Sequence, residues 1–194
     1  MNQNLSRYAF TESVKNAQSR YGSRSANARL EQSGDRFRLT DKEVAHIRSR
    51  DMFYLGTTGE NGWPYIQFRG GPKGFLKVLD DQTLGMADYR GNRQYLSTGN
   101  IKATLKALLF LVDYPSRSRL KIWSEAEVLD LDPGSELLER VTDPEYPAKV
   151  ERVFRFRVKA YDWNCPQHIT PRYSGEELRE MVGRGELDPF TVLF

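Results

Sequence analysis

The segment MADYRGNRQYLSTGN, residues 86–100, gathers side chains that suit the binding of an anion. Four of them surround one glycine where a short helix is predicted to begin: Arg90, Asn92, Arg93 and Gln94. Asn92 is a favourable N-cap, so we expect a helix over residues 93–98 that ends at Gly99. Free amide hydrogens at a helix start and planar guanidinium groups both suit a phosphate. The alternative is an ordinary capped helix whose arginines are solvated.

A second polar set lies in WPYIQFRGG, residues 63–71, which reads as a strand that ends in glycines. Strict alternation gives this strand one polar face, formed by Tyr65, Gln67 and Arg69. The glycines after Arg69 allow a flat ligand or another backbone to approach closely. A solvated strand face beside a wide loop explains the same pattern equally well.

The segment DWNCPQHITPRY, residues 162–173, places Cys165 three residues before His168. This spacing suggests a nucleophile pair or half of a metal site, but no second half appears elsewhere. A loop held in place by its aromatic residues is the commoner meaning, so we expect no metal centre. Another basic turn, DYPSRSRLK, is typical of a solubilising hairpin tip.

Composition narrows the class of protein. The chain has 194 residues, and its 29 basic and 26 acidic residues are too evenly balanced to indicate nucleic acid as the main partner. No apolar run is long enough for a secretion signal or a membrane span. A single cysteine excludes an internal disulfide framework, which favours a reducing cytoplasm.

The predicted elements place the two polar sets in a β-rich domain. A helix from Thr11 to Gly22 precedes a polar connector over residues 23–37, and Thr40 with Glu43 forms the capping box of a second helix. Residues 52–163 show mostly period-two patterning, interrupted by the helix after residue 92 and by another near residues 134–141. Six or seven strands joined largely by hairpins indicate an antiparallel barrel. A further capping box at Ser174 predicts a C-terminal helix.

The order of these features resembles a known family. Residues 49–100, from SRDMFYLG to LSTGN, resemble the FMN-binding proteins related to pyridoxamine 5'-phosphate oxidase. ALLFLVDYPSRSRLKIWSEAEV is similar to the hairpin that follows in such proteins, and the segment around Cys165 looks like the closing segment of one bacterial subgroup. The resemblance covers about residues 40–175. It implies a mainly β fold with flanking helices, a six-stranded antiparallel split β-barrel of Greek-key type.

The resemblance also implies a site. The FMN phosphate is expected at Arg69 and at the helix start. The rest of the flavin is expected to lie along the second and fourth strands and to contact a partner subunit. The cofactor-binding residues implied are Gln67, Phe68, Arg69, Gly70, Asp88, Tyr89, Arg90, Asn92, Arg93, Gln94, Tyr114, Arg119, Trp123 and Trp163. The first groups to test for a catalytic role are Tyr65, Asp88 and His168.

The expected protein is therefore a cytoplasmic FMN-binding homodimer, an oxidoreductase acting on an unidentified small molecule at the dimer interface. The segment around His168 lacks the basic motif by which the authentic oxidases bind substrate phosphate, so that particular activity is not implied. The alternatives are a flavin carrier without catalysis, a related barrel for haem or a deazaflavin, or a structural barrel with an empty site. The expected division is a helical arm over residues 1–39, the barrel over 40–175 and a C-terminal helix and tail over 176–194.

Overall fold

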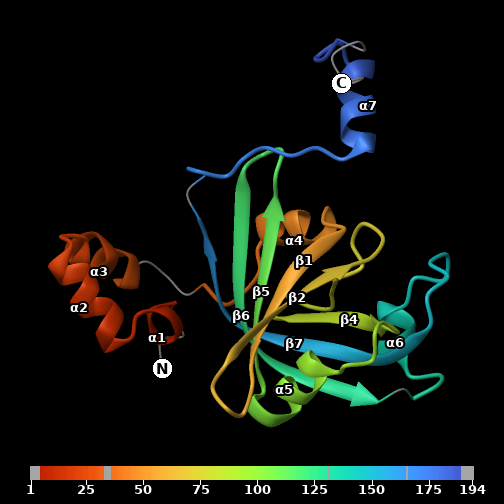
Figure 1. Ribbon diagram of the computed structural model, residues 1–194, viewed down its shortest axis with the longest axis horizontal. Helices are drawn as coiled ribbons and strands as arrows, with labels where there is room; N and C mark the ends of the chain where they lie inside the picture. Colours follow the sequence, from red (N-terminus) through yellow and green to blue (C-terminus); the bar gives the residue numbers. More distant parts are fainter. Residues whose placement is uncertain (1–4, 33–35, 131, 165, 189–194) are drawn as a thin grey trace.

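The computed structural model describes residues 5–32, 36–130, 132–164 and 166–188. Their strands form one antiparallel sheet in the order β2-β1-β5-β6-β7-β4-β3, which curls around a common core (Figure 1). The strands are β1 Met52–Thr58, β2 Pro64–Gly70, β3 Lys77–Val78, β4 Thr83–Tyr89, β5 Lys106–Asp113, β6 Ser118–Asp130 and β7 Val150–Trp163. The predicted antiparallel β class is therefore confirmed.

The strand count differs from the six of the predicted barrel. The shortest of the seven described strands, β3, has only two residues. Within the described residues β2 and β3 are the two edge strands and do not pair with each other. The hydrogen-bonded sheet is therefore open and not a closed barrel.

The helices are α1 Ser6–Ala9, α2 Glu12–Arg20, α3 Arg24–Gln32, α4 Asp41–Arg48, α5 Leu96–Thr104, α6 Glu136–Val141 and α7 Gly175–Gly183. The predicted starts at Thr11, Thr40 and Ser174 are confirmed, the last two as capping boxes. The polar connector predicted over residues 23–37 was wrong, because most of its described part is α3. Arg24 bonds Gln18 and Glu31, so polar contacts support this helix where apolar ones are scarce.

The main core lies inside the curl of the sheet. Alternate residues of β1, β5, β6 and β7 point inward, as in the buried pattern of Phe53, Leu55 and Leu109. Ile47 of α4 and Ile101 of α5 close the core, and both are fully buried. Both helices are thereby fixed to the sheet, and α5 is the one that borders the candidate site.

Helix α5 does not begin and end where the sequence indicated. Asn92 is not its N-cap: the Asn92 Oδ1 accepts the Gln94 amide hydrogen at 3.2 Å in a local turn, and Tyr95 occupies the cap position. The helix then continues through Gly99 to Thr104, because an exposed glycine costs less than Ile101 gains by burial.

The end of α5 gives a stability prediction. Leu105 caps the helix at φ +57°, a left-handed conformation that disfavours residues with a Cβ, and its side chain is exposed. Leu105→Gly should raise the free energy of unfolding by about 0.5–1 kcal/mol in denaturant titrations. Leu105→Ala keeps the Cβ and should give no gain; an equal gain from both changes would contradict the strain argument.

Candidate functional site

A pocket lies where the ends of β2 and β4 meet the turn before α5. Its walls come from four elements, and we call it the α5 pocket. It is lined by Tyr65, Gln67, Arg69, Asp88, Tyr89, Gly91, Asn92, Arg93, Gln94, Tyr95, Leu96, Ser97, Thr98 and Glu151. The structure thus brings together the two polar sets that the sequence singled out. Arg90 stands beside the pocket, its Nε 3.5 Å from a Glu151 oxygen.

The turn into α5 is conformationally strained. Arg93 and Tyr95 have φ of +61° and +55°, although neither is glycine. No side chain caps α5, and its first turn carries no acidic residue. The first amide hydrogens of the helix therefore have no side-chain acceptor and remain available to an anion. Strain of this kind persists where surrounding contacts impose it, and it is common at ligand sites.

A chain of ion pairs runs behind the pocket. Arg69 Nη1 lies 2.6 Å from Asp88 Oδ1, and Arg152 Nη1 lies 3.4 Å from Asp88 Oδ2. Arg152 Nη2 continues to Glu151 Oε2 at 2.8 Å. Burial raises the pKa of the Asp88 carboxyl, and the two guanidinium groups oppose that rise. These ion pairs fix the orientation of Arg69 but leave its buried Nε without a hydrogen-bond partner among the described residues.

Contacts from β7 hold the strained turn in place. The guanidinium carbon of Arg152 lies 4.6 Å from the centre of the Tyr95 ring, and Arg152 Nη1 donates to Thr98 Oγ1 at 3.2 Å. The Tyr95 hydroxyl donates to Glu151 Oε2 and accepts from Arg93 Nε, both at 3.3 Å. On the β2 side, Ser97 Oγ donates to Gln67 Oε1 at 2.7 Å.

The size and charge of the pocket limit its ligand. Its volume is about 50 Å³, which suits a group of phosphate size better than a flavin ring. Four arginines, at positions 69, 90, 93 and 152, stand against the two carboxylates of Asp88 and Glu151. The arrangement therefore favours an anionic group.

Two residues expected to contact the ligand from β2 lie differently. Phe68 projects from the opposite face of the strand, where it is 59% exposed and meets the edge of Tyr54. Its own ring occupies the space beside Gly70, since a Cβ at Gly70 would lie 2.8 Å from the Phe68 Cε1. Neither residue lines the α5 pocket, and a flavin contact at either one stays a prediction.

The remaining predicted residues lie outside the α5 pocket. Tyr114 has its hydroxyl 3.5 Å from that of Tyr54, and its ring lies under Arg172. Trp123 lines an apolar groove of about 550 Å³ formed by β1, β2, β5, β6 and α1, to which Tyr65 also contributes. Neither Tyr114 nor Trp123 lines the α5 pocket, and their supply by a partner subunit stays a prediction.

The C-terminal candidates also lie elsewhere. Trp163 Nε1 donates to Glu43 Oε1 at 2.6 Å, so this indole ties the end of β7 to α4. Arg119 is near the start of β6, where its carbonyl accepts the Asn164 amide hydrogen. His168 is exposed and has φ +62°. Cys165 lies outside the described residues, within which no cluster of His, Cys, Asp or Glu could hold a metal.

Sequence reasoning missed the contribution of β7. Glu151 and Arg152 were not singled out from the sequence, yet Arg152 pairs with Asp88 in the β4–β7 register. Their link to the site depends on a pairing between strands far apart in the chain, which no local pattern specifies. A β-bulge between Asp88 and Tyr89 shifts that register at the site.

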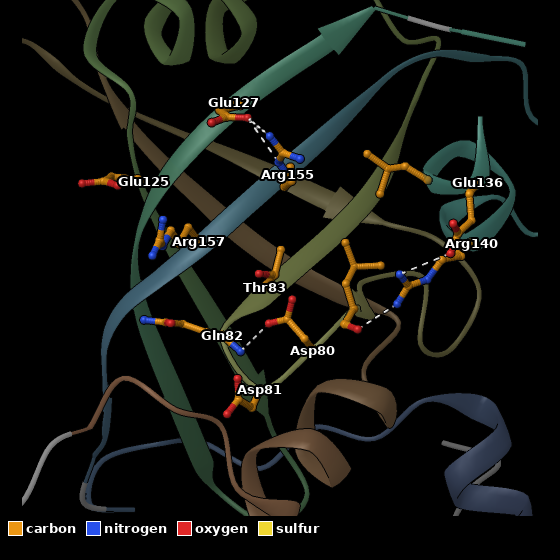
Figure 2. A pocket seen from close by; sticks show the side chains of 12 residues that line it. Asp80, Asp81, Gln82, Thr83, Glu125, Glu127, Glu136, Arg140, Arg155 and Arg157 are labelled. Carbon is orange, nitrogen blue, oxygen red and sulfur yellow. Dashed lines mark hydrogen bonds and ion pairs between the residues drawn. The ribbon is translucent and has the colours of Figure 1, made fainter.

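A cavity of about 690 Å³ is a different feature (Figure 2). It lies between β4, β6, β7 and α6, and the charges of its walls are exposed and largely paired with one another. Arg155 pairs with Glu127, and Arg140 bonds the Leu79 carbonyl (Figure 2). Because these groups already have partners and solvent, the cleft offers a ligand less than the α5 pocket does.

Comparison with known proteins assigns the chain to a family. A family model described as pyridoxamine 5'-phosphate oxidase matches residues 39–162. The chain belongs to the pyridoxamine 5'-phosphate oxidase family. The match includes β1 to β7 up to Asp162, and therefore every residue that lines the α5 pocket. The N-terminal helices α1 to α3 and the C-terminal helix α7 lie outside it.

Solved structures are similar to this family member in fold. HupZ of Group A Streptococcus is 14% identical over 70% of this chain and 100% of that chain, with a TM-score of 0.50. A putative pyridoxamine 5'-phosphate oxidase from Lactobacillus delbrueckii is 26% identical over 64% and 93%, with a TM-score of 0.49. An FMN-binding protein from Syntrophomonas wolfei is 17% identical over 64% and 88%, with a TM-score of 0.49. No curated protein matches the chain in sequence.

Proposed function

We propose that this protein binds FMN, with the flavin phosphate in the α5 pocket. The observation that carries the proposal is the junction of an uncapped α5 with Arg69, whose buried Nε has no partner. A phosphate supplies acceptors to both, and family membership makes a phosphorylated ligand the expected one. Arg93 adds a second guanidinium, since it bonds a tyrosine hydroxyl and leaves its terminal nitrogens for the ligand.

The residues of the pocket fit the phosphate end of FMN and leave the ring outside. Arg69, Arg93 and the first amides of α5 would hold the phosphate, while Asn92 and Gln94 add neutral donors at the rim. Tyr65 and Gln67 continue the same face of β2 away from Arg69 and would border the ribityl chain. The isoalloxazine ring then lies on the surface beside the pocket, where a second molecule can stack on it.

The proposed activity is oxidoreduction of a small molecule. Bound FMN supplies hydride or single-electron chemistry, and the chain supplies position and charge. Hydrogen-bond donors near the pyrimidine edge of the ring would stabilise its anionic reduced form. The proposal places the protein in the cytoplasm, consistent with its single cysteine. The helices of the described residues are each too short or too polar to cross a bilayer.

We further propose a homodimer in which the outer face of β2, β1 and β5 of one subunit packs against the other subunit. Ile66 and Phe68 are 68% and 59% exposed there, beside Tyr54. Adjacent apolar side chains on a sheet face are typical of an interaction surface. Light scattering should report a dimer for the wild type and a monomer for Phe68→Glu. Tyr21→Glu, at an exposed position on the arm, should stay dimeric; a monomeric wild type would contradict the proposal.

One experiment tests the proposed activity. Purified protein should absorb in the yellow flavin range and release FMN on denaturation. Anaerobic addition of NADPH, NADH or candidate amines should bleach the bound flavin, and oxygen should restore its colour if the protein is an oxidase. Flavin that binds but is reduced by none of these donors indicates a carrier. Protein that is colourless and does not bind added FMN contradicts the whole proposal.

A further inference from the structure

Asp88 is the central carboxylate of the ion pairs behind the α5 pocket. Its residue is 5% exposed, and each of its oxygens faces a guanidinium group, Arg69 at 2.6 Å and Arg152 at 3.4 Å. The side chains of both arginines are 13% exposed, so solvent screens these charges weakly. Without Asp88, two cations would stand side by side in a partly buried site.

The two arginines differ in how many partners they have besides Asp88. Arg152 is held further by Glu151 and Thr98 and stacks on Tyr95. Arg69 has one nitrogen on Asp88 and lies 5.1 Å from the centre of the Phe154 ring, while its buried Nε has no partner. Arg69 is therefore the arginine of the pocket lining that keeps hydrogen-bonding capacity unused, and Asp88 is the anion already beside it.

We propose that Asp88 is an exchangeable counter-ion: it neutralises Arg69 and Arg152 in the unliganded protein, and takes up a proton from solvent when a phosphate monoester enters the α5 pocket. This inference rests on the proposed FMN site and adds a proton to its binding equilibrium. The proton binds a carboxylate oxygen of Asp88, and no bond of the ligand forms or breaks. The protonated carboxyl keeps its place as a hydrogen-bonding neighbour of Arg152.

Electrostatics gives the reason. A second negative charge near a carboxylate disfavours its ionised form, and burial already disfavours it at Asp88. A phosphate bound to Arg69 also competes with the Asp88 carboxylate for the positive charge of the guanidinium group. The charged groups that face or adjoin Asp88 are Arg69 of β2, Arg152 and Glu151 of β7, and Arg90 and Arg93 of the turn before α5. Glu151 adds to the repulsion.

The test is calorimetry of FMN binding at pH 6 to 8 in buffers that differ in ionisation enthalpy, which counts the protons exchanged. The wild type should take up about half a proton per FMN more than Asp88→Asn near the pH at which the carboxyl titrates. The FMN phosphate, with its second pKa near 6, exchanges its own proton in both proteins, so the comparison removes that contribution. Riboflavin, which has no phosphate, should cause no such uptake in the wild type.

The wild type alone provides a second measurement in case Asp88→Asn does not fold. A phosphate that binds as its dianion releases its own proton near pH 6, so net proton uptake on binding of FMN is not explained by the ligand. The wild type should show this net uptake with FMN and none with riboflavin. If FMN binds tightly with equal proton exchange in both proteins, or with net proton release in the wild type, the counter-ion inference is overturned and the FMN site stands. If the protein binds neither FMN nor inorganic phosphate, both proposals fail.

Discussion

Arg69→Ala should weaken the proposed FMN binding by about 1.5–3 kcal/mol, roughly tenfold to more than a hundredfold in Kd. The change removes a charge-assisted bond to the phosphate and leaves Asp88 with Arg152 as its remaining close cation. It should also lower the free energy of unfolding, because a buried carboxylate loses its closer partner. Fluorescence titration of the flavin measures the first effect, and denaturant unfolding the second.

Arg155→Ala is the matched control. Arg155 also pairs with a carboxylate, Glu127, but it lies in the exposed cleft of Figure 2. Its loss should leave FMN affinity unchanged and alter stability by less than about 1 kcal/mol. Arg93→Ala, at the mouth of α5, should weaken FMN binding with little effect on folding, because Arg93 is exposed. If both Arg69→Ala and Arg93→Ala bind FMN as the wild type does, the phosphate lies elsewhere.

Glu43→Ala should lower the free energy of unfolding by about 3 kcal/mol, although Glu43 lies outside the α5 pocket. Glu43 is 3% exposed, and its carboxylate accepts hydrogen bonds from the Thr40 amide and hydroxyl and from the Trp163 indole at 2.6 Å. Truncation leaves all three donors without their acceptor and removes the hydrogen bond that links the end of β7 to α4. Glu12→Ala, in the exposed first turn of α2, is the control and should cost much less.

The effect of Glu43 should depend on pH in a defined direction. Burial pushes the pKa of Glu43 upward, but the hydrogen bonds from Thr40 and Trp163 outweigh it and hold the pKa below its ordinary 4.5. A carboxyl whose pKa is lowered by folding stabilises the protein above the unfolded-state pKa, and this contribution is lost as the pH falls through the folded-state value. The difference between the wild type and Glu43→Gln should thus be constant near pH 7 and shrink below about pH 4.5. A difference that grows on acidification would contradict the assignment.

The sequence was sufficient where local chemistry decides structure. Capping residues located α4 and α7, alternation placed Tyr65, Gln67 and Arg69 on one strand face, and these three indeed line the α5 pocket. Local rules failed in the turn before α5. There Asn92 has the chemistry of a cap, but contacts from β7 hold Tyr95 in the cap position at a left-handed φ.

The part of the site that could not be predicted comes from strand pairing. Arg152 is one arginine among several in β7, and nothing near it in the chain distinguishes it. It becomes a site residue because β4 and β7 pair antiparallel with Asp88 opposite Arg152. Phe68 follows the local rule instead: alternation places it on the face away from Arg69, where its side chain is exposed.

The most direct test of the central claim is to compare FMN and riboflavin as ligands of the wild-type protein at pH 7.5. The two differ only in the phosphate, which we place on Arg69, Arg93 and the start of α5. FMN should bind one per chain and at least about tenfold more tightly than riboflavin, an advantage that falls with rising salt. Equal affinities for the two flavins, or no binding of either, would contradict a phosphate site in the α5 pocket.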